Sequence, residues 1–241
     1  MEFKIQAEKN LLALKANPYP GRGIIVGLDE TGEYLVQVYW IMGRSENSRN
    51  RVFVISVGGE LKTAAADLKK VKDPSLIIYK AMAEVPYKFA VSNGHQTRDA
   101  LFERDLGRSL KNWEYEPDKP NYTPRITAIC SLDCENPHTT EISILKKSPF
   151  NGICDRYLYN LEISERGVGY CVTTYSGDGD PLPSFSGDPY LLPLVGDIKI
   201  ISQTIWNVLN EGNRVSLAVK FINIKTKETS IEVINKYNVV R

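Results

Sequence analysis

The sequence predicts an α+β protein built from one or two antiparallel sheets covered by helices. Many short runs are rich in Val, Ile, Tyr and Thr and are separated by turn residues, which is typical of antiparallel strands. Helical periodicity is confined to two clear segments and a short leading one. Nothing repeats at a fixed period, and no linker divides the chain. We therefore expect a helical leader over residues 1–18 and a single domain over residues 19–241.

The first half of the chain is expected to be mainly strands. Residues 4–16 have a helical pattern that Asn17-Pro18 ends, because the residue before a proline is kept out of the helical conformation. Pro86-Tyr87 is expected to close a hairpin. The expected strands are 21–28 and 34–42 around the turn 29–33, then 52–57, then 76–85 and 88–94 in that hairpin.

A helix is expected over residues 97–113. Phe102, Leu106, Leu110 and Trp113 fall on one face of this segment, and charged residues occupy the others. A polar, proline-rich connection over 114–125 follows.

The second half predicts further strands and one more helix. Asp197 is placed to cap a helix over 197–210, and Gly212 lies just beyond its end. A loop over 176–196, rich in Gly, Pro and Asp, is long enough to be functional or mobile. The expected strands are 126–132, 141–147, 157–164, 167–175, and a closing hairpin of 215–225 and 229–237.

Composition excludes some classes of function. Lys and Arg total 30 against 29 for Asp and Glu, so the net charge is +1 and bulk electrostatic binding of nucleic acid is not expected. No run approaches the roughly 20 apolar residues that cross a bilayer, and the N-terminus is amphipathic rather than signal-like. We therefore expect a cytoplasmic protein without a membrane partner.

The four cysteines do not form the pattern of a secreted disulfide framework. Cys130 and Cys134 are spaced as half of a metal site, but only two histidines exist and no second close pair follows. Buried free thiols on strands are the better interpretation, and no metal is expected.

Common catalytic motifs are missing from the chain. It has no P-loop, no H-E-x-x-H and no G-x-S-x-G. His95 lies in Asn93-Gly94-His95-Gln96, a setting more typical of a turn residue than of a catalytic base.

The connection over 43–51, GRSENSRNR, stands out between two apolar strands. It has three arginines, two asparagines and two serines. A solvated hairpin loop would explain them, but arginine forks and asparagine amides together also suit a phosphate or carboxylate.

Several loop motifs, in this order, resemble the archaeal-type inosine monophosphate (IMP) cyclohydrolases. The motifs are Y-x-G-R at Tyr19 to Arg22, R-S…N-R at Arg44, Ser45, Asn50 and Arg51, D-P…Y at Asp73, Pro74 and Tyr79, V-S-N-G…T…D at 91–99, Y-E…T-P-R-I at 115–126, and more faintly Thr174-Tyr175. The resemblance is strong over about residues 19–130. The leader, a longer arginine loop and a diverged C-terminal third depart from the family pattern.

The resemblance implies the N-terminal-nucleophile-hydrolase fold, a four-layer αββα sandwich of two antiparallel sheets. It also implies closure of the second purine ring: the carboxamide nitrogen of a formamido-imidazole-carboxamide ribotide attacks the formyl carbon, and water leaves to give IMP. That reaction requires positioning, polarisation and proton transfer, but no metal or organic cofactor.

The resemblance also suggests site residues. Tyr79 would donate to the formyl oxygen, Glu116 would take a proton from the attacking amide, and Arg125 would orient Glu116 or touch the phosphate. The substrate-binding residues would be Arg22, Arg44, Ser45, Asn50, Arg51 and Asn93, with the arginines neutralising the phosphate. The partners would be the ribotide precursor and IMP, and a homo-oligomer is left open.

Two alternatives remain at this point. One is an amidohydrolase on the same fold, which would need a Ser, Thr or Cys exposed at a new N-terminus; positions 17–22 have none. The other is a non-catalytic module that binds purine nucleotides, which the diverged C-terminal third makes credible.

Overall fold

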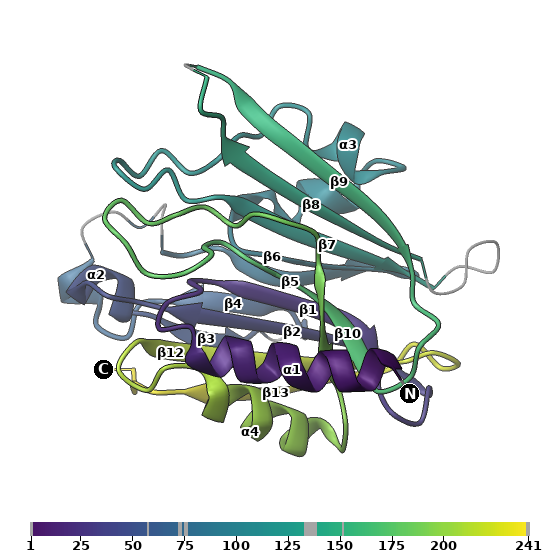
Figure 1. The fold of residues 1–241 in the computed structure, drawn as a ribbon. Coiled ribbons are helices and arrows are strands. Elements are labelled where there is room, and N and C mark those ends of the chain that lie inside the picture. The colour runs from purple at the N-terminus through teal and green to yellow at the C-terminus, as the bar shows by residue number, and fades with distance from the viewer. Residues whose placement is uncertain are drawn as a thin grey trace.

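Two antiparallel sheets stacked face to face form the body of the protein (Figure 1). The computed structural model describes residues 2–56, 58–71, 74, 77–132, 139–150 and 152–239. The six-stranded sheet has the order β11 (Tyr190–Pro193), β10 (Val168–Thr173), β1 (Gly23–Leu28), β2 (Tyr34–Met42), β12 (Arg214–Asn223) and β13 (Thr229–Asn235). The seven-stranded sheet has the order β3 (Val52–Ile55), β4 (Leu61–Ala64), β5 (Lys80–Val85), β6 (Lys88–Ser92), β7 (Arg125–Ser131), β8 (Thr139–Lys147) and β9 (Cys154–Glu162).

The six-stranded sheet is buried on both faces, which explains why its central strands are apolar without a break. Ile24 of β1 pairs in register with Tyr39 of β2, and both side chains belong to the core between the two sheets. Their neighbours Ile25 and Trp40 point the other way, into a second core beneath the helices. Because side chains alternate along a strand, only a sheet covered on both sides buries such a continuous run.

Two helices cover the outer face of the six-stranded sheet (Figure 1). They are α1 (Glu2–Ala16) and α4 (Ile198–Val208), and both lie where the sequence predicts a helix. Asp197 caps α4 by accepting hydrogen bonds from the amides of Lys199 and Ile200, at 2.9 Å each. Leu14 of α1 and Ile201 and Ile205 of α4 reach the second core.

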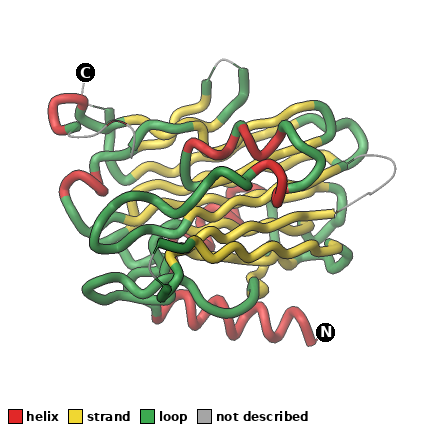
Figure 2. The backbone as a smooth tube through the Cα atoms, turned by 90° about the horizontal axis from the view of Figure 1, so that it is seen from above, coloured by secondary structure: helices red, strands yellow, loops and turns green. Residues whose placement is uncertain are grey.

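Among the described residues, short helices cover the outer face of the seven-stranded sheet (Figure 2). The predicted helix over 97–113 is wrong: Asp105 has an extended backbone and caps a new turn by accepting from the amide of Arg108, so the helix cannot run through it. Phe102 is 70% exposed, whereas Leu106 and Leu110 are buried as expected. The segment forms η3 (His95–Thr97), η4 (Asp99–Leu101) and α3 (Leu106–Ser109).

The hairpin at Pro86-Tyr87 is confirmed, and the remaining differences from the predicted elements are local. The strand expected from residue 76 begins at Lys80, and residues 75–76 lie outside the described residues. The short strand β4 was not predicted, and β11 lies inside the segment expected to be a loop. Two more short helices are α2 (Glu46–Arg49), within the arginine loop, and η1 (Leu68–Lys70).

The α+β class is confirmed, with antiparallel sheets and few helices. No helix in the described part of the chain is long and apolar enough to cross a membrane. Cys130 and Cys171 are buried free thiols on β7 and β10, as expected, whereas Cys134 of the C-x3-C pair lies outside the described residues.

Candidate active site

A cavity of about 280 Å³ lies at one end of the two-sheet body. Its walls come from segments that enter or leave strands: those before β1, β5 and β7 and those after β2 and β10. Strand ends from both sheets therefore meet there. The lining residues are Tyr19, Gly21, Arg22, Met42, Arg44, Ser45, Asn47, Ser48, Arg51, Ile77, Glu116, Asp118, Asn121, Thr123, Thr174, Tyr175 and Leu182.

The backbone at Gly21 and Arg22 is held against the end of β10. The amide of Thr174 donates to the Arg22 carbonyl at 2.8 Å, and the amide of Arg22 donates to Thr174 Oγ1 at 3.0 Å. Gly21 has φ +75°, and a Cβ there would lie 2.2 Å from Thr174 Oγ1. Only glycine combines this backbone conformation with this close approach.

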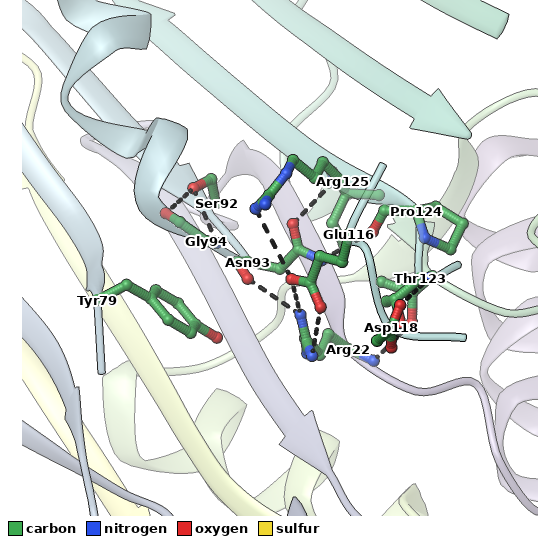
Figure 3. A network of polar contacts seen from close by, with 12 residues as sticks. Arg22, Tyr79, Ser92, Asn93, Gly94, Glu116, Asp118, Thr123, Pro124 and Arg125 are labelled. Carbon is green, nitrogen blue, oxygen red and sulfur yellow. Dashed lines mark hydrogen bonds and ion pairs between the residues drawn. The ribbon is translucent and has the colours of Figure 1, made fainter. Parts of the chain in front are cut away.

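Arg22 and Glu116 form a buried ion pair at the centre of the site (Figure 3). Arg22 Nη1 lies 2.5 Å from Glu116 Oε1, and Nη2 lies 3.1 Å from Oε2, so the pairing is bidentate. Nη1 also donates to the backbone carbonyl of Asn93 at 3.1 Å. Burial alone would lower the pKa of Arg22, but the Glu116 carboxylate, together with Tyr79 and Tyr39, raises that pKa well above its usual value.

Arg125 approaches the same carboxylate from the other side (Figure 3). Its Nη1 lies 3.8 Å from Glu116 Oε1 and donates to Gln96 Oε1 at 3.1 Å. The guanidinium lies over the ring of Trp113, 5.0 Å from its centroid. Burial lowers the pKa of Arg125, while Glu116 acts in the opposite direction. Two guanidinium groups thus flank one carboxylate.

Arg51 is a buried cation that has no carboxylate partner among the described residues. It is 3% exposed. Its Nε donates to the carbonyl of Ser48 at 2.9 Å and its Nη2 to the carbonyl of Met42 at 3.4 Å. Burial lowers the pKa of Arg51, and the nearby Arg22 lowers it further. A buried guanidinium in this situation favours an anion in the cavity.

The rest of the arginine loop is shaped by local hydrogen bonds. Ser45 caps α2: its Oγ accepts from the amide of Ser48 at 3.1 Å, and Ser48 Oγ accepts from the amide of Ser45 at 2.9 Å. Asn50 bonds to Asp67 in both directions, at 2.8 and 2.7 Å, and does not line the cavity. Its amide ties the end of the loop to the segment before η1.

Arg44 links the arginine loop to the long loop after β10. Its guanidinium contacts the carboxylate of Asp178, and Nη1 donates to the carbonyl of Gly179 at 2.9 Å. The same group lies over the ring of Tyr19, 5.1 Å from its centroid. Across the cavity, Leu182 donates its amide to Asn121 Oδ1 at 3.1 Å. These contacts join cavity-lining residues to parts of the chain that are far apart in sequence.

Tyr79 and Asn93 are not among the residues that line the cavity, although both lie next to the Arg22–Glu116 pair (Figure 3). Tyr79 is 4% exposed, and its hydroxyl lies 2.6 Å from that of Tyr39. Asn93 is fully buried; its Nδ2 donates to the carbonyl of Pro124 at 2.8 Å, and its Oδ1 accepts from the amide of Ile126 at 2.9 Å. Both amide atoms of Asn93 therefore hold the chain next to Arg125.

The structure therefore separates the predicted site residues into two groups. Those that line the cavity are Arg22, Arg44, Ser45, Arg51 and Glu116. Those that lie outside its lining are Asn50, Tyr79, Asn93 and Arg125.

Sequence reasoning missed several lining residues. Asp118 accepts from the amide and hydroxyl of Thr123 at 2.7 and 2.5 Å, and burial raises its pKa. The Thr123 hydroxyl also lies 2.5 Å from the hydroxyl of Tyr175, whose ring stacks on that of Tyr19 at 6.0 Å. The sequence feature that could have indicated Asp118 and Asn121 is the presence of polar residues in the proline-rich loop 114–125.

The described residues contain no group of three or more His, Cys, Asp or Glu side chains that could hold a metal ion. His138 and Cys134 lie outside those residues. The side chains that converge on the cavity are instead guanidinium, hydroxyl and carboxylate groups.

Fold and site together define an α+β protein with an arginine-lined cavity between strand ends, a class of site suited to a small anionic ligand. No curated protein matched the chain. A model of the family described as "IMP cyclohydrolase-like protein" matches residues 19–228. The chain belongs to this family. This match extends well into the C-terminal third of the chain, where the loop motifs show little resemblance to the family.

Proposed function

We propose that this protein is an IMP cyclohydrolase, which closes the purine ring of a formamido-imidazole-carboxamide ribotide in purine biosynthesis. Family membership over residues 19–228 supports the reaction class. The observation that carries the proposal is the juxtaposition, in one cavity, of a buried Arg51 without a carboxylate partner and a Glu116 held by Arg22. Arg51 is suited to binding a phosphate, and Glu116 is suited to proton transfer. A cytoplasmic location and an N-terminal-nucleophile-hydrolase-like sandwich are part of the same proposal.

The arginine loop would bind the ribotide phosphate. A phosphate monoester carries about −1.5 to −2 charges at neutral pH. Arg51 supplies positive charge that no described carboxylate neutralises, and Ser45 and Ser48 line the same wall. Arg44, which is 35% exposed and paired with Asp178, would close over the bound ligand. Asn50 would act by holding the end of the loop rather than by touching the phosphate.

Glu116 would accept the proton of the attacking carboxamide nitrogen. Its two oxygens already accept from Arg22, but a carboxylate offers about four lone-pair sites. Sites therefore remain for an N–H group of the substrate. Arg22 fixes the plane of the carboxylate, and Arg125, 3.8 Å away, holds it from the other side. Asn93 would position both arginines through the chain segments that it binds.

Tyr79 would donate its proton to the formyl oxygen. The carboxamide nitrogen bonds to the formyl carbon and loses one proton to Glu116, while the formyl oxygen takes the proton of Tyr79. The resulting hydroxyl leaves as water with the proton held by Glu116. The formamido nitrogen returns a proton to Tyr79 as its bond to the former formyl carbon becomes double. Because both reacting groups belong to one molecule, orientation supplies much of the rate enhancement.

Ring closure of the purified protein, followed by the absorbance of IMP, tests the proposal directly. Glu116→Gln and Tyr79→Phe should each lower kcat/KM by about 10²–10⁴-fold, the usual effect of losing a general acid or base. Glu141→Gln and Tyr170→Phe are matched controls outside the cavity lining and should retain activity. Wild-type kcat/KM in both site variants would refute the mechanism, and an inactive wild type would refute the function.

A non-catalytic module that binds purine nucleotides is the second candidate. The bidentate pairing of both Glu116 oxygens with Arg22 favours it, because a carboxylate so engaged can be purely structural. In that case IMP would raise the melting temperature by mass action while ring closure stayed undetectable. Measuring both on one preparation separates the two functions.

A further inference from the structure

The hydroxyl groups of Tyr39 and Tyr79 meet between the two sheets. Tyr39 lies on β2 of the six-stranded sheet, and Tyr79 immediately precedes β5 of the seven-stranded sheet. Their oxygens are 2.6 Å apart, and their side chains are 0% and 4% exposed. The ring of Tyr39 also packs against Phe53, with centroids 5.4 Å apart. The position of the Tyr79 hydroxyl is thus fixed by a side chain of the opposite sheet.

The surroundings decide which hydroxyl donates. Each phenol carries one proton, so if Tyr79 donated to Tyr39, the proton of Tyr39 would need another acceptor. Within the described part of the chain, Tyr79 is the only hydrogen-bond partner of the Tyr39 hydroxyl. The charged groups that act on it are Arg22 and Arg51, whose guanidinium groups donate and cannot accept. A buried hydroxyl without an acceptor is costly, and the Tyr79 hydroxyl, which faces the Glu116 network, is the one whose proton a bound ligand could accept, so the donor role fits Tyr39.

Tyr39 also remains a donor at neutral pH. Burial raises the pKa of Tyr39 well above its usual value, and Tyr79 raises it further. The proton of Tyr79 is consequently left for another acceptor. Figure 3 shows the Tyr79 hydroxyl pointing toward Arg22 and Asn93, on the side of the Glu116 network.

We infer that Tyr39 is a positioning residue that donates its hydroxyl proton to Tyr79 and thereby directs the Tyr79 proton toward the reacting formyl oxygen. This inference rests on the proposed function. When Tyr79 transfers its proton, the electron pair of the broken O–H bond stays on the Tyr79 oxygen. The hydrogen bond from Tyr39 and the charges of Arg22 and Arg51 stabilise the phenolate so formed.

Tyr39→Phe removes only the hydroxyl and tests the inference by kinetics. A hydrogen bond to a charged group strengthens as charge develops, so kcat should fall about 10- to 100-fold. KM and the melting temperature should stay near their wild-type values, because the ring still fills its place in the core. The Tyr170→Phe control, on β10, should leave kcat unchanged.

The double variant distinguishes positioning from general structural damage. In a Tyr79→Phe background, Tyr39→Phe should cause no further loss, because the group on which it acts is gone. An equal loss in both backgrounds, or full kcat in the single variant, would overturn the inference.

A measurement without turnover keeps this inference separable from the proposed function. NMR of protein labelled with ¹³C at the phenol carbon of tyrosine can show which ring carries the bridging hydroxyl proton. This proton should correlate with the ¹³C signal of Tyr39, which is assigned as the tyrosine signal that disappears in Tyr39→Phe. Correlation with the ring of Tyr79 would overturn the inference even in an active enzyme. Correlation with Tyr39 in a protein that lacks ring-closure activity would refute the function and leave the hydrogen-bond direction established.

Discussion

Replacing Arg51 by Met should separate ligand binding from stability. Arg51 is buried, donates to two backbone carbonyls, and has no carboxylate partner among the described residues. Met retains much of the apolar stem and removes the charge. If Arg51 binds the ribotide phosphate, this variant loses a charge-assisted contact that the ligand makes and the empty protein does not.

The expected magnitudes follow from those contacts. A hydrogen bond to a charged group contributes about 1.5–3 kcal/mol, so the Kd for IMP should rise about 10- to 150-fold. In the empty protein, two bonds to carbonyls are lost at about 0.5–1.5 kcal/mol each. Relief from burying an unpaired charge beside Arg22 offsets this cost. With about 2–4 °C per kcal/mol in a chain of this length, Tm should stay within about 3 °C of wild type or rise.

Isothermal titration with IMP and thermal denaturation together check this prediction. Arg49→Met is the matched control: Arg49 lies two residues before Arg51, at the end of α2, donates to the carbonyl of Gly43 at 3.0 Å, and does not line the cavity. It should leave IMP affinity unchanged. A variant at Arg51 that binds IMP normally but melts more than about 5 °C lower would show that Arg51 is structural, and the reasoning would fail.

Three further predictions concern other parts of the molecule. Arg44→Ala should raise KM for the ribotide several-fold. It should destabilise the protein by less than about 1 kcal/mol, because the exposed pair of Arg44 with Asp178 contributes little to folding. Asp178→Ala should have the same effect on KM, and an unchanged KM in both variants would contradict the proposal that Arg44 closes over the ligand. Burial raises the pKa of Asp118 in the folded protein, so this group makes stability fall as pH rises from the ordinary aspartate value of about 3.9 through the raised one. Asp118→Asn should lack that decline, so the stability of the wild type minus that of the variant, measured by denaturation at several pH values, should fall over this range; a pH-independent difference would contradict the prediction. Burial raises the pKa of Cys130 to about 11 and of Cys171 to about 12, so neither should react with a thiol reagent at pH 8 until the protein unfolds, which labelling and peptide mass mapping can check.

Local patterns in the sequence predicted most of the fold. The helices α1 and α4 and most of the strands lie close to where apolar periodicity and caps indicate. The failure at 97–113 has a physical cause: Leu106 and Leu110 do face the sheet, but Asp105 prefers to cap a new turn, and Phe102 is left exposed. Periodicity alone cannot decide between one helix and several short turns that bury the same residues.

The candidate site was less accessible to sequence reasoning. Arg22 and Glu116 were both selected, but their bidentate pairing joins positions 94 apart in the chain, and no local pattern encodes it. The sequence identifies Tyr39 only as part of an apolar strand, because its contact with Tyr79 depends on how the two sheets are stacked. Asp118 and Asn121 lay in a loop whose composition gave no information about the direction of its side chains.

The pairing of β12 with β2 bears on when the protein can become active during its synthesis. β12 is the neighbour of β2 inside the six-stranded sheet; farther along the chain than β9, Leu182 lines the cavity and Asp178 pairs with the lining residue Arg44. A nascent chain that has emerged only through residue 150 therefore has the arginine loop but lacks β12 and the segment that carries Asp178 and Leu182. Such long-range pairing forms slowly, since the chain must close large loops first. Nucleotide binding should thus appear only after β12 has emerged from the ribosome.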